Sequence, residues 1–222
     1  MRYGVKPLIR KAALALAVAL AAIAAAGAAS GAAAEIRIVA LGDSLTHGYG
    51  LPEEEGFAPR LQAWLRANGA PGAVVVNAGV SGDTTAGGLA RLDWSLGEGA
   101  DALIVELGGN DLLRAIDPAS SRANLDAILT EAGARGLPVL LAGMLAPMNY
   151  GAEYKAEFDA IFPDLAAKHG ALLDPFFLEG VVGRADLMQA DGVHPNAAGV
   201  EALVARFGPL ALELARRAER GG

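Results

Sequence analysis

The feature that most constrains the fold is an alternation, from residue 35 onward, between short apolar runs and longer amphipathic segments. The short runs are nearly continuous in apolar residues, which is typical of strands buried on both faces of a parallel sheet. The longer segments, such as 57–68 and 118–136, carry apolar residues at helical spacing. This alternation predicts an α/β fold, a three-layer α/β/α sandwich around a parallel sheet. The five strands are expected at residues 36–41, 73–76, 102–107, 138–143 and 171–173.

Polar and glycine-rich segments follow three of these strands directly, at residues 42–46, 77–85 and 108–111. The carboxyl ends of parallel strands meet at one edge of the sheet, where open α/β sheets bind their ligands. We therefore expect the three segments to converge on one site, although glycine also serves simply to make turns.

The first 34 residues differ in composition from the rest. Residues 1–11 carry four Lys or Arg and no acid, residues 12–34 are uncharged, and Ala32-Ala33-Ala34 ends the segment. This pattern predicts a cleaved signal peptide over 1–34 and a single domain over 35–222. The alternative is a retained membrane anchor, because so long an uncharged stretch can span the hydrocarbon core. We expect cleavage, because alanine is only weakly hydrophobic, and hence a periplasmic or secreted protein without a stable membrane anchor.

Composition excludes several kinds of site. The chain has no cysteine, which rules out disulfides, thiolate metal sites and a cysteine nucleophile. It has only three histidines, which argues against a multi-histidine metal site. The net charge is −7, and removal of the four leader cations leaves −11, which disfavours binding to nucleic acid. We therefore expect no thiolate or multi-histidine metal site and no nucleic-acid partner.

Ser44 and His194 are the side chains best suited to catalysis. Ser44 follows the first strand in the sequence G-D-S-L, where a tight turn can expose both its hydroxyl group and its backbone N–H. Asp191, three residues before His194, can accept the Nδ1–H bond and leave Nε2 free as a base. The alternatives are a helix N-cap for Ser44 and an ordinary surface position for His194. The G-x-S-x-G motif of α/β-hydrolases is absent, because Thr46 occupies its last position.

Two other strand ends offer hydrogen-bond donors. Gly79 has a backbone N–H that no side chain obstructs, and Asn110 has a side-chain amide. Together with the N–H of Ser44, these groups form a candidate oxyanion hole with three donors. Loop capping is the alternative role for Asn110. Asp43 and Asp111, in the same turns, are expected to fix the loops through hydrogen bonds rather than to act as catalytic acids.

Four sequence blocks resemble, in order, those of the SGNH (GDSL-type) hydrolase family: G-D-S-L at 42–45, N-A-G at 77–79, G-G-N-D at 108–111 and D-x-x-H at 191–194. Further segments are similar to the exported bacterial arylesterase branch, itself similar to the multifunctional thioesterase/protease/lysophospholipase: 80–85, 149–151 and 191–196. The resemblance covers essentially the whole chain after residue 34. It implies a flavodoxin-like, five-stranded parallel sheet, in agreement with the strand pattern.

The resemblance implies that Ser44 is the nucleophile and that His194, supported by Asp191, is the base. It also implies an oxyanion hole formed by Ser44, Gly79 and Asn110. The implied reaction transfers an acyl group from a carboxylic ester, a thioester or a lysophospholipid to water, without a metal or cofactor. The partner would be a small-molecule or lipid acyl ester, and we expect a monomer or a small homo-oligomer. The physiological substrate, its chain length and the preference between ester and thioester stay open.

The chain departs from the resembled branch at His47 and Met148, where a small residue and a proline are common. His47 is expected to be an exposed turn residue, the alternative being a place in the pocket wall. Met148 is flexible and apolar, which suits the wall of an acyl or leaving-group pocket. Trp64 and Trp94 are expected to lie in the core. The candidates for the substrate pocket are Leu112, Leu113, Leu145, Met148 and Asn149.

Three other functions stay open at this point. A carbohydrate O-deacetylase on the same fold is disfavoured, because sugar sites favour exposed aromatic side chains and only 5% of this chain is aromatic. A non-catalytic ligand-binding α/β module is disfavoured by the complete set of Ser44, Asp191 and His194 and by the absence of phosphate-binding glycine motifs. A membrane-anchored structural protein rests on the leader alone.

Overall fold

A five-stranded parallel sheet forms the centre of the computed structural model, which describes residues 34–97 and 99–221. The strand order is β2-β1-β3-β4-β5, so the direction of winding reverses between β1 and β3. The predicted α/β class and parallel sheet are confirmed, whereas the predicted signal peptide lies outside the described residues except for Ala34. The strands are β1 Ile36–Gly42, β2 Ala73–Gly79, β3 Ala102–Glu106, β4 Val139–Ala142 and β5 Leu172–Asp174.

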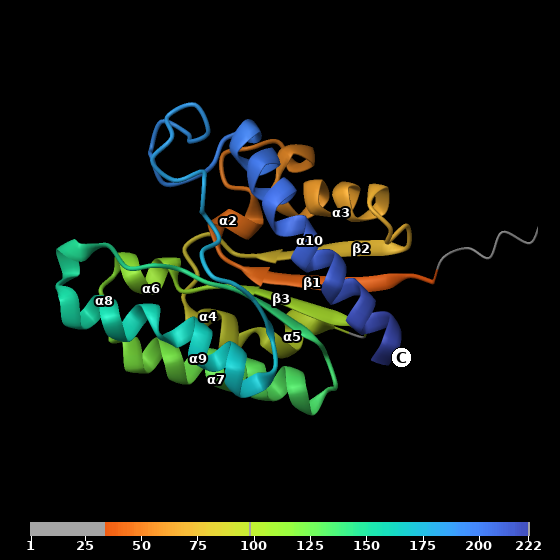
Figure 1. Cartoon of the computed structure of the whole chain (residues 1–222), viewed down its shortest axis with the longest axis horizontal. Coiled ribbons are helices and arrows are strands. Elements are labelled where there is room, and N and C mark those ends of the chain that lie inside the picture. Colours follow the sequence, from red (N-terminus) through yellow and green to blue (C-terminus); the bar gives the residue numbers. More distant parts are fainter. Residues whose placement is uncertain (1–33, 98, 222) are drawn as a thin grey trace, which may run out of the picture. The chain divides into compact units, whose positions relative to one another are not determined.

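Helices cover both faces of the sheet, which confirms the three-layer arrangement (Figure 1). One face carries α3 (Phe57–Ala67) and α10 (Ala197–Gly221). The opposite face carries α4 (Thr85–Ala90), α5 (Leu92–Leu96), α7 (Pro118–Ala134) and α9 (Ile161–His169). The remaining short elements are α2 Ser44–His47, η1 Glu53–Glu55, α6 Gly109–Leu113, η2 Met148–Tyr150 and α8 Ala152–Asp159.

The core lies between the sheet and each helical layer. Between the sheet and helices α3 and α10, three phenylalanine rings pack edge to face with centroids 5.1 to 5.5 Å apart: Phe57, Phe177 and Phe207. Trp64 on α3 is partly buried against this core. The prediction that Trp94 is a core residue is wrong, because its side chain is 81% exposed. Helix α5 has only five residues, and Leu92 and Leu96 occupy its buried face instead.

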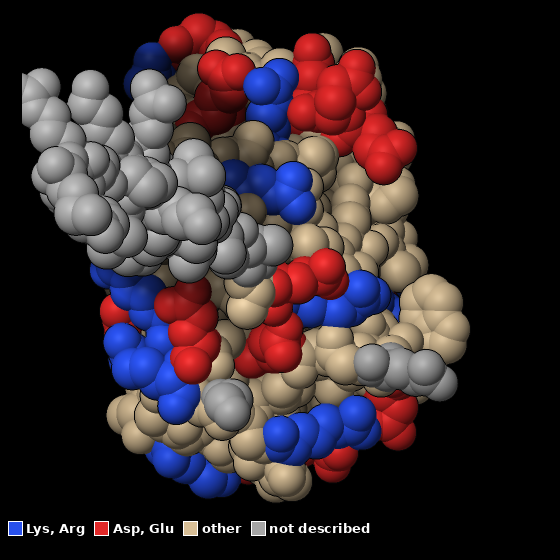
Figure 2. All heavy atoms as spheres, turned by 90° about the vertical axis from the view of Figure 1, so that its right-hand side faces the viewer, with Lys and Arg blue, Asp and Glu red and all other residues tan. Residues whose placement is uncertain are grey.

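The strands begin at one edge of the sheet and the predicted catalytic residues follow the opposite edge. Figure 2 views the edge at which the strands begin, where acidic and basic side chains are interspersed. At the other edge the winding reversal between β1 and β3 leaves room for a ligand between the loops that follow them. Among the described residues, no helix is both long enough and apolar enough to span a bilayer.

Candidate active site

Ser44 is the first residue of the four-residue helix α2, directly after β1. The N-cap is Asp43, whose Oδ1 accepts a hydrogen bond from the backbone N–H of Leu45 at 2.9 Å, so Ser44 does not serve as the cap. A Cβ atom on Gly42 would lie 2.0 Å from the Thr46 side chain, so the tight entry into α2 needs glycine there. The backbone N–H of Ser44 has no partner within the described part of the chain. The turn thus presents a hydroxyl group and a free N–H together.

His194 connects Ser44 to Asp191 through two short contacts. The Nε2 atom lies 2.9 Å from Ser44 Oγ, and Nδ1 lies 2.7 Å from Asp191 Oδ2. The hydrogen bond from His194, followed by the backbone N–H groups of His194 and Val193, lowers the pKa of Asp191 to about 2. An ionised Asp191 accepts the Nδ1–H bond, which leaves the lone pair of Nε2 facing the serine hydroxyl. The three side chains therefore form one continuous hydrogen-bonded chain.

The loop that carries His194 is held by a residue that sequence reasoning missed. The Gln189 side chain donates to the backbone carbonyl groups of Tyr49 at 2.7 Å and Pro195 at 3.0 Å. The Tyr49 ring in turn lies against the His194 ring, with centroids 4.7 Å apart. Gln189 therefore joins two segments that are far apart in sequence and orients the histidine. No motif distinguishes Gln189 in the sequence, because its partners are backbone atoms.

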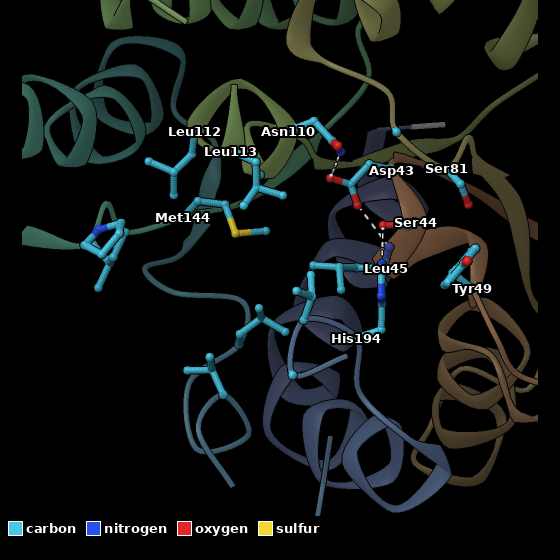
Figure 3. Close-up of a pocket in the computed structure, with 18 of the residues that line it drawn as sticks. Asp43, Ser44, Leu45, Tyr49, Ser81, Asn110, Leu112, Leu113, Met144 and His194 are labelled. Carbon is cyan, nitrogen blue, oxygen red and sulfur yellow. Dashed lines mark hydrogen bonds between the residues drawn. The ribbon is translucent and has the colours of Figure 1, made fainter. Parts of the chain in front are cut away.

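Asn110 projects from the start of α6, directly after β3, toward the same site (Figure 3). Its Nδ2 atom donates to Asp43 Oδ2 at 2.9 Å. The Asp43 carboxylate only accepts hydrogen bonds, so this contact fixes which end of the amide faces it. The N-cap of α6 is Gly108, without a side-chain bond, so Asn110 does not cap this helix.

The structure does not bring Gly79 to the pocket. Its N–H donates to Asn77 Oδ1 at 3.0 Å, and a Cβ atom there would lie 2.3 Å from the backbone nitrogen of His47. Gly79 therefore permits two backbones to approach closely. Gly82 lines the pocket instead, with a φ of +83°, and its N–H has no partner among the described residues. Sequence reasoning missed Gly82, although it is a second glycine in the same strand-end segment.

Hydrogen bonds from side chains fix the loops around the site. As predicted, Asp111 is a loop-fixing residue: it is buried and accepts hydrogen bonds from Thr85 and from Ser121. The N-cap of α4 is Thr84, not the neighbouring Asp83. Asp83 instead forms an ion pair with Arg91, with 2.6 Å between Oδ2 and Nε.

Arg91 also ties together the carboxyl ends of two strands. Its guanidinium group donates to the carbonyl oxygen of Gly42 at 2.9 Å and to that of Ala78 at 2.7 Å. The ends of β1 and β2 are therefore held in fixed positions next to Ser44.

A largely apolar pocket of about 670 Å³ opens beside Ser44 and His194. The predicted pocket residues Leu112, Leu113 and Leu145 line it, together with Met144, Phe176, Leu178 and Val182. Figure 3 shows Leu112, Leu113 and Met144 on one side of Ser44 and Tyr49 on the other. Met148 and Asn149 do not line the pocket, because they lie exposed in η2. His47 is exposed at the end of α2, as expected.

Comparisons with known proteins agree with this geometry. Residues 40–202 match the GDSL-like Lipase/Acylhydrolase family. Esterase TesA of Pseudomonas aeruginosa is 44% identical over 178 residues, which cover 80% of this chain and 88% of the relative. Thioesterase 1/protease 1/lysophospholipase L1 of Escherichia coli strain K12 is 40% identical over 165 residues, which cover 74% of this chain and 77% of the relative.

Solved structures are similar over nearly their full length. The crystal structure of TesA has a TM-score of 0.75 at 41% identity and covers 80% of this chain and 99% of its own. The crystal structure of AlinE4, an SGNH-hydrolase family esterase, has a TM-score of 0.68 at 50% identity and covers 81% of this chain and 96% of its own. Both proteins therefore share the fold and much of the sequence of this chain.

Proposed function

The chain belongs to the GDSL-like lipase/acylhydrolase family, and we propose that it is an exported serine esterase in which Ser44, His194 and Asp191 carry the reaction. The observation that carries the proposal is the continuous contact from Ser44 Oγ through His194 to Asp191 at the mouth of an apolar pocket. Relatives named esterase, arylesterase and thioesterase support hydrolysis of carboxylic esters as the chemistry.

The proposed reaction passes through an acyl-enzyme. His194 Nε2 takes the proton of Ser44 Oγ as this oxygen attacks the carbonyl carbon of the substrate. The tetrahedral intermediate then collapses, and His194 returns the proton to the leaving alcohol or thiol. In the second half, His194 deprotonates a water molecule that attacks the acyl carbon, and Ser44 regains the proton as the carboxylic acid leaves. Asp191 stays ionised and stabilises the imidazolium form of His194.

Three donors are proposed to stabilise the negative oxygen of each intermediate: the N–H groups of Ser44 and Gly82 and the amide of Asn110. Gly82 replaces the predicted Gly79, because the N–H of Gly79 is already bonded to Asn77. Preorganised donors of this kind are commonly the largest source of rate enhancement in acyl transfer. Asp43 fixes the Asn110 amide before substrate binds, so no reorganisation is needed during the reaction.

The substrate is proposed to be an ester or thioester with an aliphatic acyl group, such as a fatty acyl ester or a lysophospholipid. The lining of the pocket supports this class, because aliphatic side chains from α6 and from the loops after β4 and β5 dominate it. A carbohydrate O-deacetylase is less well supported. Tyr49 and Phe176 are the aromatic side chains among the pocket residues, and Trp94, although exposed, does not belong to the pocket.

Export to the periplasm or beyond is part of the proposal and rests on the basic and alanine-rich segment 1–34. Expression of the full chain in a bacterial host, followed by N-terminal sequencing of the soluble protein, tests it. A mature N-terminus near Glu35 is expected. A membrane fraction that retains Met1 contradicts cleavage and supports the anchored alternative.

The activity is tested with p-nitrophenyl esters from acetate to palmitate, with acyl-CoA and lysophospholipid in parallel. Ser44→Ala and His194→Ala are expected to lose about 10⁶-fold in kcat, as is typical for the nucleophile and base of serine hydrolases. Ser120→Ala and His47→Ala are matched controls, because both side chains are exposed and neither takes part in the hydrogen bonds that link Ser44, His194 and Asp191. A fluorophosphonate should label the wild-type protein once, on Ser44. Hydrolysis retained in both active-site variants would contradict the proposal.

A further inference from the structure

Glu106 is a buried acid that the proposed acyl transfer does not use. It is the last residue of β3, in the interior of the sheet, and it is 0% exposed. Its Oε2 atom accepts a hydrogen bond from Thr46 Oγ1 at 2.8 Å and a longer one from the backbone N–H of Asp43 at 3.4 Å. Its Oε1 atom has no partner among the residues that the structure describes. The carboxyl group therefore lies against the turn that carries Ser44.

A second buried acid, Asp43, shares this space and is only 2% exposed. One of its oxygens accepts the N–H of Leu45, and the other accepts the Nδ2 group of Asn110. Within the described residues, no Lys or Arg side chain acts on the pKa of either acid. Two negative charges in a buried site without a cation repel each other strongly, so such a pair retains a proton.

Of the two acids, Glu106 is the one on which this proton is favoured. Burial, followed by the negative charge of Asp43, raises the pKa of Glu106 well above its ordinary value. Burial also raises the pKa of Asp43, but the hydrogen bonds from Leu45 and Asn110 oppose that rise by favouring the charged form. The neutral form is therefore favoured more strongly at Glu106 than at Asp43.

Building on the proposed esterase function, we propose that Glu106 is a positioning residue: while its carboxyl group is protonated, it accepts the backbone N–H of Asp43 without repelling the Asp43 carboxylate. Asp43 in turn orients the amide of Asn110 and caps the helix that begins with Ser44. The contacts run without a gap from the end of β3, through the end of β1, to two of the groups that face the substrate. Glu106 itself touches no substrate, because it is fully buried and does not line the pocket.

The proposal predicts an alkaline limit to activity. When Glu106 loses its proton, two carboxylates repel each other inside the fold, and Asp43 can no longer hold Asn110 in place. Two titratable groups act electrostatically on this pair: the charge of Asp43 raises the pKa of Glu106, and the charge of His194 lowers the pKa of Asp43. The other neighbours of Glu106, Thr46 on α2 and Ala142 on β4, are uncharged. Activity is therefore present while Glu106 is protonated and is lost as the pH rises through its raised pKa.

The test measures kcat and KM for p-nitrophenyl butyrate across neutral and alkaline pH, with Ser44→Ala as the blank. Glu106→Gln keeps the shape and a hydrogen-bond donor but cannot ionise, so its kcat at neutral pH should stay within about threefold of wild type. In this variant, the fall of kcat at alkaline pH should shift to higher pH or disappear. Thr46→Val removes a donor that favours the charged form of Glu106, so the fall should shift to higher pH by a smaller amount. Glu157→Gln, an exposed control with the same change of charge, should leave the profile unchanged.

Glu106→Ala should lose about 10²-fold in kcat with little change in KM, because an oxyanion donor is loosened and the acyl pocket is untouched. An alkaline limb that stays in place in both Glu106→Gln and Thr46→Val overturns the proposal. So does a loss at neutral pH in Glu106→Gln as large as in Glu106→Ala. These failures differ from a failure of the proposed function, which retained hydrolysis in Ser44→Ala would reveal.

An infrared difference spectrum of wild type against Glu106→Gln reads the proton directly and does not depend on catalysis. A band of a protonated carboxylic acid at neutral pH, present in wild type and missing in the variant, is expected. A spectrum with only carboxylate bands overturns the proposal.

Discussion

Two carboxylates flank Ser44, and the structure holds them in opposite ways. Asp191 lies on a loop with its side chain 40% exposed, and hydrogen bonds lower its pKa to about 2. Asp43 lies beneath α2 and is 2% exposed, and burial raises its pKa. Asp191 orients His194, whereas Asp43 fixes the turn that carries Ser44 and the amide of Asn110.

The two carboxylates are held in place by different kinds of contact. The Asp191 side is a solvated loop, held by Gln189 and by contact with Tyr49, and water screens its charges. The Asp43 side is built on the ends of β1 and β3, where Glu106 and Arg91 hold backbone and side chains in the interior. Asp191 is therefore held mainly by contacts of an exposed loop, and Asp43 by contacts in the interior.

The largest effect on kcat is expected from a substitution of Asp191, the exposed carboxylate. Asp191→Asn leaves the shape intact but favours the wrong histidine tautomer, so kcat should fall by about 10⁴-fold or somewhat less, given the exposure of this carboxylate. Because the pKa of Asp191 is about 2, the acid limb of the wild-type pH profile should not arise from Asp191. Asp186→Asn is the control, since Asp186 is exposed and pairs with Arg184. A loss below tenfold, measured by steady-state hydrolysis, would mean that the loop alone orients His194.

The next largest effect on kcat is expected from a substitution of Asn110, which is bonded to the buried Asp43. Asn110→Ala removes one oxyanion donor, so kcat should fall by about 10²–10³-fold while KM changes little. Asn68→Ala, which removes a surface amide bonded to the Trp64 carbonyl oxygen, is the control. Binding of a trifluoromethyl ketone, which forms the tetrahedral adduct, should weaken in parallel with kcat. Equal loss of kcat and of ground-state binding would show that Asn110 holds the substrate rather than the transition state.

A smaller effect concerns the pocket that adjoins the buried side. Leu112 lies two residues after Asn110 on α6 and lines the pocket. Leu112→Trp should shorten the space for the acyl chain and lower kcat/KM for long-chain esters by about 10–100-fold relative to acetate. Met148→Trp is the matched control, because Met148 is exposed outside the pocket. A uniform loss for all chain lengths would place the acyl chain elsewhere.

The buried side also shows where sequence reasoning is sufficient and where it is not. The strand pattern predicted the five parallel strands, because buried strands need continuous apolar runs. The contacts among Ser44, His194 and Asp191 follow the predicted order, because strand ends and a tight Asp-x-x-His loop limit the geometry. The roles of these residues in catalysis remain proposals.

The surroundings of other residues could not be predicted, because they depend on contacts between segments that no local sequence pattern encodes. Gly79 and Gly82 lie in one short segment, and only the direction of each N–H separates them. Met148 and Trp94 are apolar residues that the structure leaves exposed, because the short helices that carry them have other residues facing inward or none. Glu106 ends an apolar strand and carries no sign in the sequence that its carboxyl group meets Asp43.

The smallest expected effect compares the two carboxylates by their influence on stability. The folded-state pKa of Asp191 is lowered, so its contribution is present above its ordinary pKa of 3.8 and is lost as the pH falls through about 2. The folded-state pKa of Asp43 is raised, so the folded state binds its proton more tightly and the contribution of Asp43 to stability falls as the pH rises above 3.8. Tm measured against pH should therefore give opposite trends for Asp191→Asn and Asp43→Asn. The amount by which the Tm of Asp191→Asn lies below that of wild type should shrink toward low pH. The Tm of Asp43→Asn relative to that of wild type should be highest at high pH. Parallel trends would mean that burial of Asp43 does not control its ionisation.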